Sequence, residues 1–547
     1  MTSEFELTLP ALFARSAEIH RDSNALSYVG EKAVSYGELK YRIASLSAHM
    51  ERIGVRPGDR IAILGSNMPN WGICYLATVF MGAVAVPLLP DFHPREIGNI
   101  LTHSESKLIF VSEGLRSKLE GLETEDRISV IGMEDFSPVD PSSSIPAYEH
   151  GRIPEIHHVA EENDLAAIIY TSGTSGSSKG VMLSHRNICS NVLACRQLHM
   201  VTKEDRFLSL LPLSHTLENT IGFLVPLMNG ACVNYLKKPP SPSVLLAAMA
   251  EVHPTIMLSV PMVIEKIYFQ KIMPAMYGKW ILRSLMRAPF LKRFMHRAAG
   301  RKLMDSFGGK LEFFGIGGAR LNSRVEQFLI DARFPYAVGY GLTETSPLLA
   351  GAVVGKTRLG STGPAIEGVE LKIHKPDPRT GEGEIWARGP NVMMGYYREP
   401  GLTSEVLDRE GWLRTGDLGC FDREGNLFIR GRLKNMIVGA SGENIYPEEI
   451  EFVINNFKHV VESLVIEKKG KLVALVHFNL EEIEQATQHL REELNSFMEK
   501  KLDELLQEIK EYVNSRVNKF SQVQSFVVQT APFQKTATQK IKRYLYH

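Results

Sequence analysis

The sequence predicts an α/β protein with a large N-terminal domain and a small, mobile α+β C-terminal domain. With 547 residues, the chain is too long to bury a single hydrophobic core. Over residues 1–431, short apolar runs alternate with amphipathic helical segments, which is typical of parallel sheets covered by helices. Residues 436–547 have a different pattern, which predicts a separate unit joined to the first by residues 432–435.

Four apolar runs in the first domain have the length and composition of buried strands. They are RIAILGSN (60–67), KLIFVS (107–112), LAAIIY (165–170) and LEFFGIGGA (311–319). Ligands of open α/β sheets bind in the turns that follow the carboxyl ends of such strands, so we expect these turns to form a site. Residues 383–430 contain short strands and tight turns, which predicts a small β subdomain within the large domain, beside stacked α/β subdomains.

The C-terminal unit combines helices with a hairpin. A helix is expected to begin at Pro447, followed by two acidic residues that suit its first turn. The run SLVIEKKGKLVALVHF predicts two strands that turn at residues 469–470, and residues 481–512 carry apolar side chains at helical spacing.

Composition excludes several classes of protein. Hydrophobic residues make up 44% and charged residues 23% of the chain, as in ordinary globular proteins. Lys and Arg together number 62, as do Asp and Glu, so no overall charge attracts nucleic acid and no nucleic-acid partner is expected. The five cysteines form no C-x-x-C pair, which favours a reducing compartment, and the first residues lack a signal-peptide pattern; we expect a cytoplasmic protein.

One uncharged stretch, residues 71–90, is long enough to span a bilayer. Gly82 interrupts it, and Val84 and Val86 in its second half alternate as in a strand. This pattern favours a buried helix followed by a buried strand.

The segment YTSGTSGSSKG (170–180) combines glycines and hydroxyl side chains with one cation, Lys179. Backbone amides, hydroxyls and a lysine are suited to binding phosphate. The spacing differs from that of a P-loop, because Lys179 follows Ser178 and Gly180 stands where a P-loop has Ser or Thr. The strand-like run VMLSH follows directly, so the loop must bind with its own groups rather than with a helix N-terminus. The alternative, a mobile Ser/Gly linker, fits less well between two apolar strands.

Four further stretches complete a set of five motifs. They are GYGLTETSP (339–347), RTGDLG (414–419), GRLKNMIVGASGENIYPEEIE (431–451) and QKTATQKIKR (534–543). In this order and spacing, the five motifs resemble those of the adenylate-forming superfamily. The runs LPLSHTLE (211–218), FFGIGGARL (313–321) and KTATQKIKRYLY (535–546) resemble its long-chain fatty acyl-CoA synthetase branch most.

The resemblance implies an AMP-forming fatty acid–CoA ligase. Such an enzyme uses ATP and Mg²⁺ to turn a medium- or long-chain carboxylate into acyl-AMP, and then transfers the acyl group to CoA. An alternative acceptor is the phosphopantetheine of an acyl carrier protein. A rival of another class is a nucleotide-binding module that senses lipid without chemistry, against which the full set of motif residues argues.

The resemblance also assigns the nucleotide-binding residues. The loop would hold the β- and γ-phosphates, Tyr340 would stack on adenine, and Asp417 would accept hydrogen bonds from the ribose, with Arg432 beside it. The phosphate loop comprises Thr171, Ser172, Gly173, Thr174, Ser175, Gly176 and Lys179, and the strip on the other side of the base comprises Gly317, Gly318 and Ala319.

The catalytic residues follow from the same motifs. Thr343 would donate to the α-phosphate, and Glu344, with Thr171, would ligate Mg²⁺, which prefers oxygen ligands. His215 matches a position near the acyl carboxylate, although a satisfied core histidine remains an open alternative.

Three lysines near the C-terminus compete for one role. The family pattern selects Lys540 over Lys535 and Lys542, and implies that it bridges the acyl carboxylate and the α-phosphate. Gln539 departs from the pattern, which has Gly at that position.

The resemblance further implies that the C-terminal domain rotates between the two half-reactions. The hinge matches Lys434, and the loop containing Gly439 and Gly442 would then face the pantetheine arm of CoA.

Residues 271–304 form a basic segment. They contain nine Lys or Arg and no acid, interleaved with bulky apolar residues, and Pro274 and Pro289 divide them into short helices. This pattern predicts peripheral contact with an anionic membrane at its inner face. The alternative is a helical excursion on the surface whose basic face is solvated.

Overall fold

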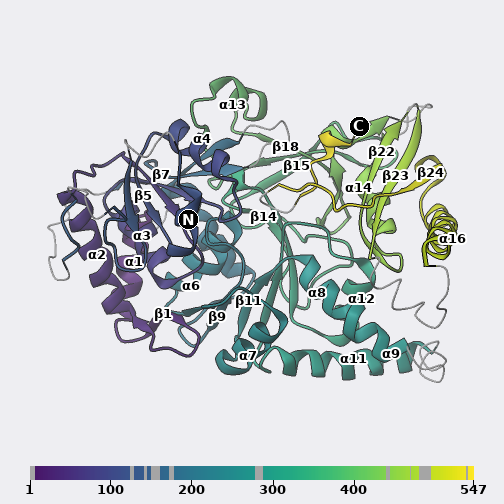
Figure 1. Ribbon diagram of the computed structural model, residues 1–547, viewed down its shortest axis with the longest axis horizontal. Coiled ribbons are helices and arrows are strands. Elements are labelled where there is room, and N and C mark those ends of the chain that lie inside the picture. Colours follow the sequence, from purple (N-terminus) through teal and green to yellow (C-terminus); the bar gives the residue numbers. More distant parts are fainter. Residues whose placement is uncertain are drawn as a thin grey trace.

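The computed structural model describes residues 6–122, 128–140, 145–149, 160–171, 178–277, 288–438, 444–468, 470–479, 494–536 and 540–546. Two large sheets and a small four-stranded sheet form the N-terminal body, and a smaller sheet with its helices forms the C-terminal part (Figure 1). This arrangement confirms the α/β fold class.

The first large sheet has seven strands in the order β17-β8-β7-β4-β3-β5-β6. The strands are β3 (Arg60–Leu64), β4 (Val84–Leu88), β5 (Ser106–Val111), β6 (Ser129–Gly132), β7 (Leu165–Thr171), β8 (Lys179–Ser184) and β17 (Gly395–Tyr396). From β7 to β6 neighbouring strands are parallel, whereas β8 is antiparallel to both β7 and β17. The predicted phosphate loop therefore connects two strands, as its apolar flanks indicated, and the structure shows that these strands are antiparallel.

The second large sheet has eight strands in the order β14-β13-β12-β11-β9-β10-β1-β2. The strands are β1 (Asn24–Tyr28), β2 (Val34–Ser35), β9 (Arg206–Ser209), β10 (Cys232–Tyr235), β11 (Ile256–Ser259), β12 (Phe313–Ile316), β13 (Tyr336–Gly341) and β14 (Leu348–Gly351). All pairs are parallel except those made by the edge strands β2 and β14.

Helices pack on and between the two sheets (Figure 1). They are α1 (Leu9–Ile19), α2 (Tyr36–Arg52), α3 (Pro69–Phe80), α4 (Pro94–Ser104), α5 (His185–Ala194), α6 (Val225–Leu227), α7 (Pro242–Val252), α8 (Pro261–Ile267), α9 (Met273–Tyr277), α11 (Pro289–Ser306) and α12 (Ser323–Ala332). Apolar side chains of α1, α2, α3, α5 and α6 and of both sheets form one continuous core, which makes the two sheets a rigid support for the loops that follow their strands. The helices α7, α8, α9, α11 and α12 pack in a second cluster, and α4 packs in a third.

The stretch 71–90 is a buried helix and a buried strand, α3 and β4, as its pattern predicted. The turn between them contains Gly82 with φ +69°, a left-handed conformation that glycine adopts without strain. Within the described residues, no helix is both long and apolar enough to cross a membrane.

The predicted β subdomain is a four-stranded antiparallel sheet in the order β15-β16-β18-β19. Its strands are β15 (Glu370–His374), β16 (Gly383–Arg388), β18 (Leu413–Phe421) and β19 (Leu427–Arg432), and α13 (Pro400–Val406) precedes β18. The last strand ends at Arg432 and leads into a single 3₁₀ turn, Leu433–Asn435, before the C-terminal part.

The C-terminal part has its own sheet and its own core. Its elements are β20 (Ile437–Val438), β21 (Asn444–Ile445), α14 (Pro447–Ile454), β22 (Val460–Lys468), β23 (Lys471–Phe478), α16 (Leu494–Asn514) and β24 (Ser525–Val528). The helix that begins at Pro447 is confirmed, as is the hairpin, whose strands β22 and β23 lie on either side of residues 469–470. The predicted long helix is present as α16, and the first part of its expected range, 481–493, lies outside the described residues.

Candidate active site

The centre of the candidate site is a carboxylate, Asp417, that is held on both oxygens. Asp417 on β18 lies opposite Arg432 on β19, and the Arg432 Nε lies 2.7 Å from its Oδ1. The hydroxyl of Tyr340, at the end of β13, donates to its Oδ2 at 2.7 Å. Burial raises the pKa of Asp417 above its usual value, and Arg432, Tyr340 and Lys540 oppose that rise. Because the guanidinium is permanently charged and donates at close range, the carboxylate is ionised at neutral pH.

The C-terminal segment brings Lys540 to the same place. Lys540 is exposed to solvent on one side. Protein atoms on its other sides partly desolvate the ammonium group, and this desolvation, followed by the charge of Arg432, lowers the pKa of Lys540. Asp417 and Glu344 act in the opposite direction, so Lys540 lies within electrostatic reach of both carboxylates. Of its competitors, Lys535 is paired with Glu462 at 2.7 Å.

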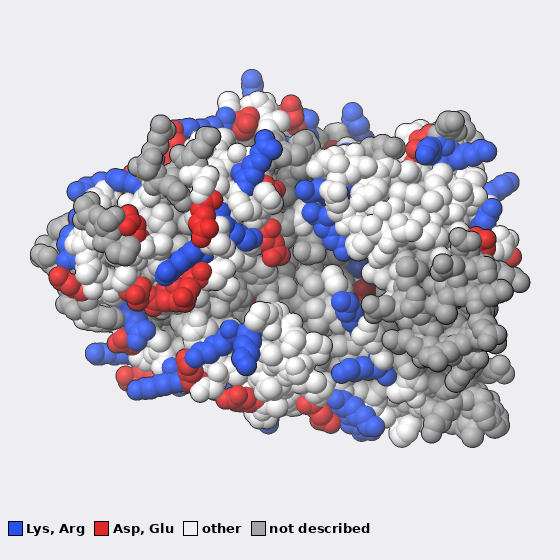
Figure 2. Space-filling model, viewed as in Figure 1, with Lys and Arg blue, Asp and Glu red and all other residues white. Residues whose placement is uncertain are grey.

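Four cationic side chains converge around the cleft. The pKa of Lys434 is lowered first by desolvation and then by the charges of Arg432, Lys179 and Lys540. Like charges destabilise one another, so their convergence indicates a site whose natural occupant is a polyanion. On the face drawn in Figure 2, Lys and Arg side chains lie on both sides of a hollow between the N-terminal body and the C-terminal part.

His215 lies near Lys540 as a neutral base. Desolvation, and then the charge of Lys540, lowers the pKa of His215 to about 4. Its Nδ1 accepts a hydrogen bond from the backbone N–H of Leu217 at 3.2 Å, which leaves Nε2 as the protonated nitrogen. His215 therefore lies at the site, and its Nδ1 is satisfied locally as in a core histidine.

The strip after β12, residues 317–319, consists of two glycines and an alanine. A Cβ on Gly317 would lie 3.0 Å from the Leu217 side chain, and Gly318 has φ +86°. Gly318 therefore favours glycine, and a side chain on Gly317 would press on Leu217. Gly317 is buried, whereas Gly318 and Ala319 are exposed.

Residues 13–397 match the family model described as AMP-binding enzyme. The chain belongs to the AMP-binding enzyme family. Among its curated relatives, long chain acyl-CoA synthetase 1 of Arabidopsis thaliana is 30% identical over 95% of this chain and 87% of that protein. The long-chain-fatty-acid–CoA ligase heimdall of Drosophila melanogaster is 29% identical over 84% of this chain and 74% of its own. These relatives place the chain in the long-chain acyl-CoA synthetase branch, as an ATP-dependent ligase.

Solved structures share the fold over almost the whole chain. o-Succinylbenzoate CoA synthetase from Bacillus subtilis, in complex with its acyl-adenylate intermediate, has a TM-score of 0.77 at 23% identity and covers 98% of both chains. ATP-bound MatB from Rhodopseudomonas palustris has a TM-score of 0.76 at 24% identity, covering 99% of this chain and 98% of its own.

Among the described residues of this AMP-binding enzyme, Tyr396 on β17 contacts two expected site residues, although the motifs did not indicate it. Its hydroxyl donates to Glu344 Oε1 at 2.9 Å, and its ring lies 5.0 Å from Lys179 Nζ. Burial and the charge of Glu344 raise the pKa of Tyr396, so the hydroxyl remains a donor. Tyr396 thereby connects the metal ligand expected from one motif with the lysine expected from another.

The structure describes only part of the expected phosphate loop and of the residues expected to contact pantetheine. Thr171 and Lys179 face each other across β7 and β8, at the two ends of the phosphate loop. The loop residues Ser172, Gly173, Thr174, Ser175 and Gly176 lie outside the described residues, as do Gly439 and Gly442, which are expected to face pantetheine. Thr343 and Glu344 form a 3₁₀ turn after β13, beside Tyr340.

Proposed function

We propose that this enzyme activates a medium- or long-chain fatty acid with ATP and transfers the acyl group to CoA. The observation that carries the proposal is the meeting of Tyr340, Asp417, Arg432 and Lys540 in one cleft, although the chain separates them by up to two hundred residues. The named relatives in the long-chain acyl-CoA synthetase branch support the fatty acid as substrate and CoA as acceptor.

In the first half-reaction, a carboxylate oxygen attacks the α-phosphorus of ATP, the bond to the bridging oxygen breaks, and pyrophosphate leaves. Two anions must meet, so the protein contributes mainly alignment and neutralisation of charge. Lys179 and the phosphate loop hold the leaving pyrophosphate, and Thr343 donates to the α-phosphate. Lys540 lies between the two reacting groups, and neutral His215 adjoins the acyl carboxylate without adding charge.

The nucleoside end is held by the Asp417 cluster. Tyr340 presents its ring to adenine while its hydroxyl stays bonded to Asp417, and residues 317–319 lie on the other face of the base. The Asp417 oxygens keep lone pairs for the two ribose hydroxyls, since each accepts one bond from the protein.

Glu344 and Thr171 are suited to Mg²⁺. The Glu344 carboxylate is half-buried and uses only Oε1 toward Tyr396 within the described structure, so Oε2 is available as a hard oxygen ligand. Glu344 and Thr171 would hold the Mg²⁺ ion, which would supply positive charge to offset that of the phosphates. Tyr396 orients Glu344, which fixes where that ligand points.

In the second half-reaction, the CoA thiolate attacks the acyl carbonyl and AMP leaves. A thiol that enters the same cleft must replace Lys540, so residues 436–547 rotate as a domain against residues 1–431 about residues 432–435. Gly439 and Gly442 then approach the pantetheine arm. The single turn Leu433–Asn435, which joins two separately packed units, supports a hinge at Lys434.

The hinge is tested by Lys434→Pro, which fixes φ, with Lys434→Ala as the control that keeps the backbone free. We expect Lys434→Pro to slow acyl transfer from added acyl-AMP to CoA, or adenylation, by at least about tenfold relative to Lys434→Ala. Equal rates for the two variants in both half-reactions would place the hinge elsewhere.

The substrate and the acceptor are tested together. We expect ATP–pyrophosphate exchange across a panel from acetate to oleate and aryl acids to be strongest with long-chain acids, and CoA to yield the thioester. Exchange with aryl acids alone would overturn the fatty-acid assignment. Transfer to the phosphopantetheine of a carrier protein but not to CoA would identify the alternative acceptor.

We further propose that α11 contacts the inner face of an anionic membrane from the cytoplasm. His296 pairs with Asp331 at 2.9 Å, which anchors one side of α11 to α12. The opposite side exposes Phe290 (80%) and Phe294 (60%), one helical turn apart. Five basic residues accompany these rings, namely Lys292, Arg293, Arg297, Arg301 and Lys302, against one acid, Asp305. Exposed rings among basic side chains are suited to an anionic interface.

Vesicle sedimentation tests this contact. We expect binding to vesicles that contain anionic phospholipid, weakened at least about tenfold in Phe290→Ser/Phe294→Ser because two large apolar side chains no longer insert. Ile19→Ser, which removes an equally exposed apolar side chain on α1, is the control. No binding at low salt, or equal binding by the double variant and the control, would contradict the membrane contact.

A further inference from the structure

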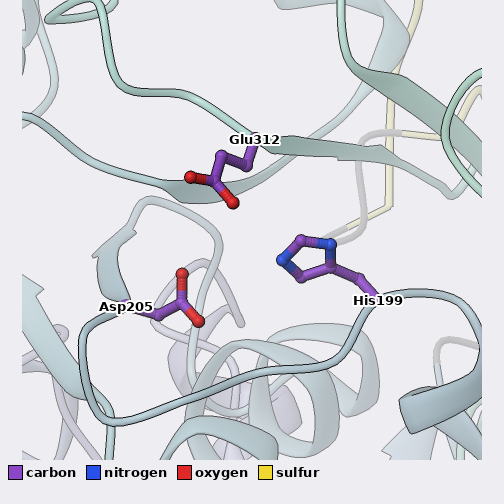
Figure 3. A group of neighbouring side chains, drawn as sticks. All are labelled: His199, Asp205 and Glu312. Atoms are coloured by element: carbon purple, nitrogen blue, oxygen red, sulfur yellow. The ribbon is translucent and has the colours of Figure 1, made fainter.

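A second group of metal-binding side chain types lies away from the nucleotide cleft. His199 follows the 3₁₀ turn Cys195–Gln197, Asp205 immediately precedes β9, and Glu312 immediately precedes β12. One ligand atom from each lies within 4.8 Å of the other two. Figure 3 shows the imidazole and both carboxylates directed toward a common point.

Among the described residues, the side chains and backbone groups that hydrogen-bond to the buried Asp205 carboxylate are neutral donors. Asp205 is 7% exposed, its Oδ1 accepts from the Thr255 hydroxyl at 2.7 Å, and its Oδ2 accepts from the Thr202 N–H at 2.8 Å and hydroxyl at 3.2 Å. The adjacent Arg206 directs its guanidinium to the carbonyls of Val252 and His253 instead. Within the described part of the chain, neither Asp205 nor Glu312 forms an ion pair. A buried carboxylate without a counter-charge is costly, so this position favours a cation.

The three side chains rest on a shared frame. Thr255, just before β11, bonds Asp205 through its hydroxyl and accepts the Glu312 N–H with its carbonyl at 2.7 Å. The His199 ring packs against Phe313, the neighbour of Glu312, with 5.4 Å between ring centroids. Hydrogen bonds to a ligating carboxylate are the usual support that orients metal ligands.

We propose that His199, Asp205 and Glu312 bind a zinc ion. One imidazole nitrogen and two carboxylate oxygens are a donor set that Zn²⁺ accepts, with water as a fourth ligand. Zn–N and Zn–O bonds of about 2.0 to 2.2 Å place tetrahedral ligand atoms about 3.4 Å apart. The present spacing reaches that value with a small movement, and Glu312, which is exposed, is free to make it.

The position defines the role of the ion. Asp205 and Glu312 precede the parallel strands β9 and β12 and so lie at the N-terminal ends of these strands. The nucleotide strip 317–319 follows β12 and lies at the C-terminal end. The zinc ion therefore ties two strands and the segment after α5 together and stabilises the fold, and it takes no part in the ligase reaction.

The test uses the full-length protein, stripped with chelator and titrated with Zn²⁺ without nucleotide. We expect one high-affinity zinc ion per chain by calorimetry and a thermal midpoint raised by a few degrees at saturating zinc. Glu312→Gln and His199→Gln are expected to weaken the affinity by about 100-fold or more, because each removes a ligand. Glu204→Gln, which changes an exposed acid beside Asp205, is the matched control and should bind as the wild type does.

Either of two results overturns the proposal: no zinc binding by the stripped wild-type protein, or equal affinity in Glu312→Gln and Glu204→Gln. Glu312 is exposed, so its variant keeps the fold, and circular dichroism verifies this. The readout needs no activity, so failure here leaves the proposed ligase function untouched.

Discussion

Replacing Tyr396 with Phe isolates one hydrogen bond of the cleft. The ring stays, with its packing and its position 5.0 Å from Lys179 Nζ, and only the hydroxyl that donates to Glu344 at 2.9 Å is lost. A hydrogen bond to a charged group contributes about 1.5 to 3 kcal/mol. Glu344 is partly open to solvent, so we take the lower end, about 1.5 kcal/mol, which is about a tenfold effect.

Fatty-acid-dependent ATP–pyrophosphate exchange measures this effect. We expect kcat/KM to fall about tenfold in Tyr396→Phe and the Mg²⁺ concentration for half-activation to rise, because Glu344 is less well oriented. Tyr397→Phe is the matched control, since the Tyr397 hydroxyl interacts with Arg398 rather than with Glu344. Exchange by Tyr396→Phe within twofold of the control would refute the positioning role.

Three further outcomes follow from charges in and near the cleft. Glu344→Gln should raise the Mg²⁺ requirement of exchange at least about tenfold with an unchanged thermal midpoint; an unchanged requirement would remove Glu344 from the metal site. Burial raises the pKa of Glu218 to about 8, so the folded state favours the neutral carboxyl. The contribution of Glu218 to stability is therefore fully present below about pH 4.5 and is lost as the pH rises through 8. Glu218→Gln should therefore stabilise the protein by on the order of 3 kcal/mol at pH 8 and by little at pH 5 in denaturant unfolding, and equal effects at both pH values would contradict this. The pKa of His215 is about 4, so its stabilising contribution is present above about pH 6.5 and lost as the pH falls through 4. Adenylation by His215→Gln should keep the shape of the wild-type pH profile between pH 5.5 and 8, and loss of an inflection there would show that His215 titrates in that range.

The arrangement of strands was predictable where burial leaves a local pattern. The runs that became β3, β5, β7 and β12 are mostly apolar, since parallel strands between helical layers are buried on both faces. The break at Gly82 was also predictable. Gly82 forms a left-handed turn that separates a buried helix from a buried strand, and glycine adopts this conformation without strain.

The site was predictable only where its residues stand in recognisable motifs. The motif pattern selects Lys540 over Lys535, and in the structure Lys535 pairs with Glu462 instead. Tyr396 carries no local signal, because its role depends on the pairing of β17 with β8 more than two hundred residues away. Long-range pairing of this kind is set by tertiary packing rather than by local propensity.

The zinc ligands illustrate the same limit. His199, Asp205 and Glu312 come from three segments, and no spacing in the sequence relates the first two to the third. Asp205 and Glu312 meet because β9 and β12 are both parallel neighbours of β11, so the residues that precede these strands lie together at their N-terminal ends.

Trapping the intermediate tests the central claim most directly. Enzyme mixed with ATP, Mg²⁺ and palmitate but no CoA, then quenched and analysed by mass spectrometry, should contain palmitoyl-AMP and pyrophosphate. Addition of CoA before the quench should convert the palmitoyl-AMP to palmitoyl-CoA with release of AMP. Formation of ADP and phosphate instead, or no acyl-AMP at any time, would contradict the account.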